Sequence, residues 1–176
     1  MKSLAIAVAG VAVVVIGWAA FRPELLFIDR RVSEAFPDGP GAPGAGSMDE
    51  RDRRGTIVAG GAFRGVAHAT RGEAAIHALR DGSRILRLTE FETSNGPDLR
   101  VLLVAADDAP DHDTVRTAGA GSGWVELGRL KGNIGDQNYE VPSSVDLDKY
   151  RTVTIWCHRF SVNFGSAPLR RSTGGA

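Results

Sequence analysis

The residues with the clearest chemical potential lie in the segment Trp156-Cys157-His158-Arg159, which holds the only cysteine of the chain. A thiol can act as a redox group or a ligand, and nearby cations lower its pKa. Successive side chains of a strand point to opposite faces, so Arg159 would share the face of Cys157 and His158 would not. Free cysteines also serve as small apolar core residues. The local sequence leaves both roles open.

A second group of polar side chains lies in residues 106–113, which read Ala-Asp-Asp-Ala-Pro-Asp-His-Asp. Carboxylates and His112 are candidate metal ligands, but Ca²⁺ takes about six or more oxygen ligands in a defined loop geometry. The spacing matches no EF-hand, and the histidines form no pair with metal-site spacing. We predict a solvated acidic loop and no metal site, with a metal-binding accessory role as the lesser alternative.

Signatures of common enzymes are missing from the sequence. It contains no Gly-x-Ser-x-Gly elbow, no Walker loop and no Gly-x-Gly-x-x-Gly opening a helix. The segment Gly132-Asn133-Ile134-Gly135 has two glycines three residues apart, but it lies between predicted strands, where a tight turn explains it. The chemistry of the chain therefore depends mainly on Cys157.

From residue 54 onward, short apolar stretches alternate with turn residues such as Gly60-Gly61, Arg71-Gly72 and residues 132–136. Strands spaced roughly 8–12 residues apart, without a sustained helical period, predict an all-β fold, an antiparallel β-sandwich or barrel-like domain. Val153, Ile155 and Cys157 share one strand face, so we expect the thiol to face inward. The predicted strands are residues 56–58, 62–69, 73–79, 83–91, 99–105, 123–127, 137–141, 152–158 and 161–164.

The N-terminal part of the chain has a different character. After a short tail, residues 1–3, the 18 residues 4–21 carry no charge, and as a helix they would span about 27 Å, close to a bilayer core. We predict a transmembrane helix acting as a signal anchor, with a cleaved signal peptide as the alternative. Residues 22–36 are then a juxtamembrane segment, 37–54 a Gly/Pro-rich flexible linker tethering the domain, 55–169 the β domain and 170–176 a disordered tail.

Composition narrows the class of protein. The 176 residues carry 21 basic and 21 acidic side chains, so the chain lacks the basic surplus typical of nucleic-acid binding, and we expect no nucleic-acid partner. One cysteine excludes an intramolecular disulfide framework. The length fits one domain plus additional segments.

Four ordered blocks of the sequence carry a family resemblance: residues 60–72, 86–103, 127–142 (LGRLKGNIGDQNYEVP) and 153–169 (VTIWCHRFSVNFGSAPL). Together they resemble the DM13 domain over about residues 55–169. The resemblance implies that Cys157 is a redox centre, either as a bare thiol or as a ligand to a prosthetic group such as haem. We add His68 and Arg159 as auxiliaries.

The chain looks like a membrane-anchored bacterial DM13 domain-containing protein. That resemblance implies a single-pass protein of the cell membrane with an extracytoplasmic β domain and an electron-transfer or thiol-redox role. Its partners would be the cytoplasmic membrane, through residues 4–21, and a redox partner or cell-envelope component. The alternative is a non-catalytic cell-surface binding module in which Cys157 is structural.

Overall fold

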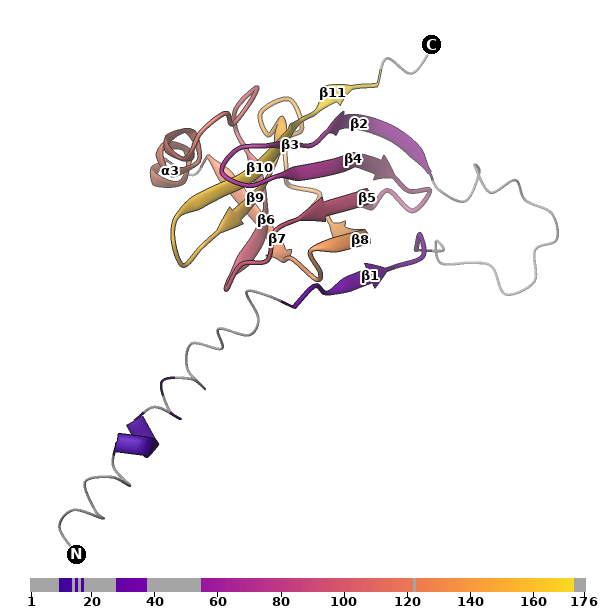
Figure 1. Cartoon of the computed structure of the whole chain (residues 1–176). Helices are drawn as coiled ribbons and strands as arrows, with labels where there is room; N and C mark the ends of the chain where they lie inside the picture. Colours follow the sequence, from indigo (N-terminus) through magenta and orange to yellow (C-terminus); the bar gives the residue numbers. More distant parts are fainter. Residues whose placement is uncertain are drawn as a thin grey trace, which may run out of the picture.

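The computed structural model describes residues 10–13, 15, 17, 28–37, 55–121 and 123–172. Residues 28–37, 55–121 and 123–172 form a mostly β domain with the helix α3 (His112–Ala120) packed beside it (Figure 1). The strands are β1 (Arg31–Ser33), β2 (Thr56–Ala62), β3 (Arg64–Gly65), β4 (Thr70–Ala78), β5 (Arg84–Thr93), β6 (Leu99–Val104), β7 (Trp124–Arg129), β8 (Ile134–Glu140), β9 (Thr152–Cys157), β10 (Val162–Pro168) and β11 (Arg170–Arg171).

The strands form two sheets that enclose one apolar core. The first sheet has the order β1-β8-β5-β4-β2-β11, and the second has the order β3-β10-β9-β6-β7. Ile76 and Leu86 of the first sheet and Val101 and Ile155 of the second are 0% exposed and belong to the same core cluster. The prediction of an all-β sandwich is therefore confirmed.

Strands β6 and β9 are buried on both faces, because α3 and the segment before it cover the outer side of the second sheet. Leu102, Val104 and Trp156 form a separate apolar cluster there with Val115 of α3. The helix was not predicted from the sequence. Only Val115 is buried among its side chains, so it has no apolar stripe with a helical period.

Several glycines that were predicted to mark turns lie inside strands. Gly60 and Gly61 belong to β2, and a Cβ on Gly61 would lie 2.0 Å from the Pro168 carbonyl oxygen. Gly72 lies at a bulge between β4 and β5 with φ +109°, which favours glycine. Close backbone approach explains Gly61 and Gly72. The prediction of one strand over residues 62–69 is also wrong, because β2 ends at Ala62 and β4 begins at Thr70.

The structure adds a strand that the sequence did not predict. Residues 31–33 form β1, which pairs in parallel with β8, whereas they were assigned to a juxtamembrane segment. Since β1 and β2 belong to the same sheet, the Gly/Pro-rich tract joins two strands of one sheet. The prediction that it tethers the domain away from the preceding segment is therefore wrong. Residues 38–54 of the tract lie outside the described residues.

The two ends of the chain are described only in part. Most of the predicted transmembrane span, residues 4–21, lies outside the described residues, although positions 10–13, 15 and 17 are helical. Within the described ranges, no helix has the length and apolar character needed to cross a membrane. At the other end, Arg170 and Arg171 pair with β2, so the predicted disordered tail does not begin at residue 170. Residues 173–176 are outside the description.

Candidate functional site

Cys157 is the last residue of β9 and faces the space between the sheets. Its side chain is 0% exposed and belongs to the apolar cluster that contains Val153 and Ile155. Leu99 of β6 and Val162 of β10 are its cross-strand neighbours. The inward orientation predicted from strand alternation is confirmed, and the thiol lies in an apolar environment.

The surface is nevertheless only one residue away along the chain. The β9–β10 turn begins directly after Cys157, and the side chain of His158 is 62% exposed. Phe160 in this turn is 58% exposed, and Ser161 adopts the left-handed φ of +53°. The thiol is thus covered at the closed end of a hairpin, directly beside an exposed turn.

Asp98 holds this turn in place. The backbone N–H of His158 donates to the Asp98 carbonyl oxygen at 2.9 Å, and His158 Nδ1 lies 3.7 Å from Asp98 Oδ2. Arg100 Nε donates to Asp98 Oδ1 at 2.7 Å. This hydrogen bond lowers the pKa of Asp98 against the opposing effect of burial. Sequence reasoning missed Asp98, because its partner His158 is distant in the chain.

The predicted auxiliaries occupy two different places. His68 stacks on Phe164 of β10, with ring centroids 3.8 Å apart and planes inclined at 25°. Arg159 lies in the exposed turn. Its predicted alignment with the thiol on one strand face is wrong, because β9 ends at Cys157. The functional roles of both residues remain predictions.

The acidic segment has partners of its own. His112 Nδ1 accepts the backbone N–H of Asn163 at 3.1 Å. Among the described residues, no group of three or more histidine, cysteine, aspartate or glutamate side chains could hold a metal ion. The segment therefore positions α3 and the turns around it. Its carboxylates pair with basic residues or cap the helix: Asp107 with Arg151, Asp108 with Arg64, Asp113 with Arg116, and Asp111 with the N–H of Thr114.

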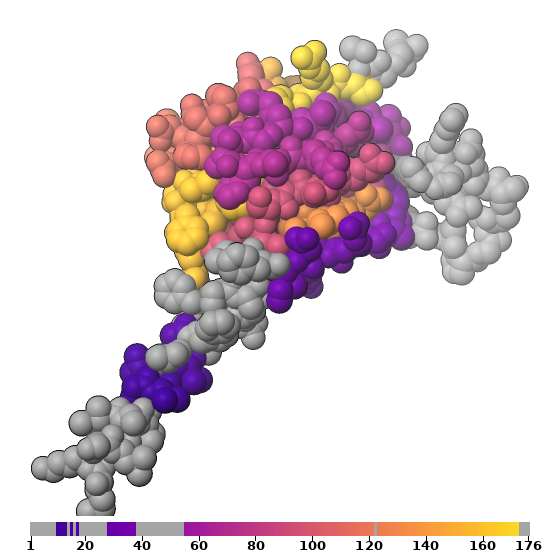
Figure 2. Space-filling model, viewed as in Figure 1, coloured from indigo at the N-terminus to yellow at the C-terminus, as the bar shows by residue number. Residues whose placement is uncertain are grey.

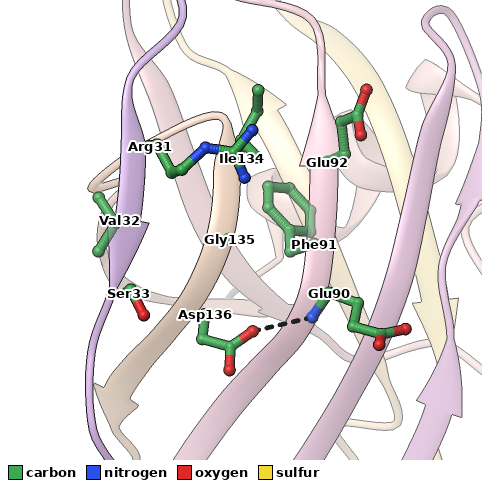
Figure 3. Close-up of a pocket in the computed structure, with 9 residues that line it drawn as sticks. All are labelled: Arg31, Val32, Ser33, Glu90, Phe91, Glu92, Ile134, Gly135 and Asp136. Atoms are coloured by element: carbon green, nitrogen blue, oxygen red, sulfur yellow. Dashed lines mark hydrogen bonds between the residues drawn. The ribbon is translucent and has the colours of Figure 1, made fainter.

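The described surface of the domain includes the following three hollows. One lies between β1, β5 and β8 (Figure 3), a second between residues 28–30, 95–99 and 129–133, and a third between α3 and residues 105–106. Cys157 lines none of the three. Its surroundings are filled by side chains with 0% exposure, such as Val153 and Ile155. A haem would need an open apolar cavity at the sulfur, so the residues around Cys157 do not fit it as a ligand of that group.

These features define a two-sheet β domain that encloses a single thiol at the end of a hairpin. A family model described as "Electron transfer DM13" matches residues 62–169. The chain therefore belongs to the DM13 family, as its sequence motifs indicated, and the family description supports a role in electron transfer. No curated protein and no solved structure matches the chain.

Proposed function

We propose that this chain is a membrane-anchored, extracytoplasmic electron-transfer protein in which Cys157 is the redox group. The family match supports the electron-transfer role. The observation that carries the assignment to Cys157 is its position, fully buried yet adjacent to an exposed turn. A thiol in that position is protected from uncontrolled oxidation while the turn is closed and can react once the turn opens.

The thiol would exchange electrons through a disulfide-bearing partner protein. The Cys157 thiolate attacks one partner sulfur, a new S–S bond forms, the partner's S–S bond breaks, and the released thiolate takes up a proton. The product is a mixed disulfide between Cys157 and the partner, with the other partner sulfur released as a thiol. This step needs direct contact between the sulfurs, so residues 158–161 must first move away from the hairpin end.

Asp98 is a positioning residue in this mechanism, because it determines how readily the turn opens. Opening breaks the hydrogen bond from the His158 amide to the Asp98 carbonyl oxygen. It also separates the Asp98 carboxylate from the His158 ring. Weakening these contacts should therefore expose Cys157 without altering the core around it.

The uncharged residues 4–21 support membrane anchoring. Residues 28–37 are docked on the sheet. Only six residues lie between Phe21 and Ile28, and the seven steps from one to the other extend at most ~25 Å. An anchor at residues 4–21 would therefore hold the domain at the membrane surface. The bacterial family layout favours the extracytoplasmic side, and a redox partner or envelope component would be met there.

A second candidate function is a non-catalytic cell-surface binding module. The complete burial of Cys157 among aliphatic side chains favours this alternative, because a structural cysteine commonly has this environment. In that case the loops would carry the binding function.

Thiol labelling of the native full-length chain distinguishes the two candidates. Amide exchange in the core strand β6 measures the rate of global unfolding. We expect Cys157 to be labelled faster than that rate. Asp98→Asn weakens the 3.7 Å contact between the carboxylate and the His158 ring and leaves the backbone hydrogen bond in place, so it should raise the labelling rate by about two- to fivefold. Asp148→Asn, which removes an exposed pair with Arg171, is the matched control and should change little. Labelling that follows global unfolding in all three proteins would support the structural role instead.

A further inference from the structure

The edge of β8 carries a strand from outside the part of the chain that matches the family. We name residues 28–37 the strap; it runs along one edge of the domain beside β8 (Figure 2). None of its residues belongs to the buried apolar core. The family match begins only at residue 62. The strap therefore packs against a domain whose core is complete without it.

Backbone groups of the strap are bound along its length. The Ile134 N–H donates to the Arg30 carbonyl oxygen at 3.3 Å, and the Glu34 N–H donates to the Asp136 carbonyl oxygen at 3.0 Å. Beyond β1, Asn138 Nδ2 donates to the Ala35 carbonyl oxygen at 2.7 Å. This is the pattern by which an extended peptide adds a strand to a sheet edge.

Acidic side chains of the strap meet dedicated donors on the domain. The Glu34 carboxylate accepts bonds from Lys131 Nζ at 2.8 and 2.9 Å and from the Asn138 N–H at 2.8 Å. Asp29 Oδ1 accepts Asn133 Nδ2 at 2.8 Å. Asn133 Oδ1 in turn accepts the Arg30 N–H at 2.7 Å. These contacts depend on the identity of the strap side chains, whereas backbone pairing between two strands alone does not.

Missing side chains on the domain make room for the strap. A Cβ on Gly132 would lie 2.4 Å from the Arg30 carbonyl oxygen and 2.6 Å from Val32 Cγ2. A Cβ on Gly135 would lie 2.0 Å from the Val32 carbonyl oxygen, and Figure 3 shows β1 alongside β8 at this point. Farther along, the Phe36 ring lies edge-on to His77, with centroids 4.8 Å apart.

We propose that the edge of β8 is a peptide-binding groove whose ligand is the chain's own strap, bound in cis. The groove selects an extended parallel strand with acidic side chains at the positions of Asp29 and Glu34. It also selects a small aliphatic side chain at Val32 and an aromatic ring at Phe36. The strap can dissociate while the rest of the domain remains folded. No contact in this argument involves Cys157, so this inference is independent of the proposed redox function.

Peptide binding to a strap-impaired full-length chain tests this proposal. Glu34→Lys places a second ammonium group beside that of Lys131. It therefore weakens the binding of the strap and leaves the groove residues unchanged. A labelled peptide of residues 28–37 should bind this variant at least about tenfold more tightly than it binds the wild-type chain, whose groove is occupied. A peptide carrying the same Glu34→Lys change should not bind. Equal binding of the native peptide to both chains, or to neither, would overturn the proposal.

Amide hydrogen exchange is the second measurement, and it is applied to a variant, Gly132→Ala, that changes the groove and not the strap. The three atoms nearest to a Cβ on Gly132 all belong to the strap, and Gly132 has no positive φ. We expect faster exchange of the Ile134 and Asn138 amides and unchanged exchange in β9. Gly60→Ala, whose Cβ would meet its nearest atom at 3.4 Å, is the control. If Gly132→Ala or Glu34→Lys unfolds the whole domain, the strap is an integral strand and the proposal fails.

Discussion

Replacing Cys157 by serine and by alanine tests whether water or a polar group reaches the thiol. Cys157 is 0% exposed and lies in the apolar cluster. Alanine removes one sulfur atom and should reduce the free energy of unfolding by about 1 kcal/mol through lost apolar contact. Serine loses the same contact and also buries a hydroxyl group without a partner, which adds about 1–3 kcal/mol. We therefore expect serine to lie about 2–4 kcal/mol below wild type.

The assay is urea unfolding of the full-length variants, with the m-value checked to be constant so that the free energies can be compared. Ser161→Ala in the adjoining turn controls for effects of the hairpin end. If the serine variant is as stable as the alanine variant, a polar partner or water reaches residue 157. The description of the thiol as enclosed in a dry core would then be refuted.

Three further predictions concern neighbouring features. Thr154 Oγ1 is buried without a hydrogen-bond partner, so the isosteric Thr154→Val should be neutral or raise the free energy of unfolding by up to about 1 kcal/mol in urea unfolding; a loss above that size would reveal a hidden partner. Although burial by itself raises the pKa of Glu34, Lys131 and the nearby Arg87 and Asn138 N–H lower it below 4.5. The strap contact should therefore be intact at neutral pH and weaken as pH falls through that lowered pKa, as followed by the amide resonance of Asn138; the same transition in Glu34→Gln would contradict this. Gly61→Ala should destabilise the domain by about 1–3 kcal/mol in thermal unfolding, because its Cβ would lie 2.0 Å from the Pro168 carbonyl oxygen; an unchanged melting temperature would show that this approach can relax.

The sandwich and the inward cysteine could be predicted because they depend on local alternation. In β9, Val153, Ile155 and Cys157 lie two residues apart, and this period fixes which face meets the core. The nearly continuous apolar run of β6 indicates instead a central strand that is buried on both faces. Residue type and spacing were sufficient at these positions.

Other features depend on contacts that no local pattern encodes. The strap has only three residues in its strand, with alternate exposure and no apolar period. Asp98 acquires its role from His158, 60 residues later in the chain. Gly61 was misread as a turn residue because its requirement for glycine comes from the Pro168 carbonyl group across the sheet. Such residues are determined by tertiary packing.

The central claim is that Cys157 carries electrons, and protein-film voltammetry of the full-length chain tests it most directly. The wild-type protein should show a redox wave that disappears in Cys157→Ala. Oxidation should remove one free thiol per chain, as the Cys157 sulfurs of two chains lose two protons and two electrons and form an intermolecular disulfide. Asp98→Asn should increase the rate at which that wave develops, because the turn opens more readily. Identical voltammograms for the wild-type and Cys157→Ala proteins would contradict the claim and leave Cys157 as a structural residue.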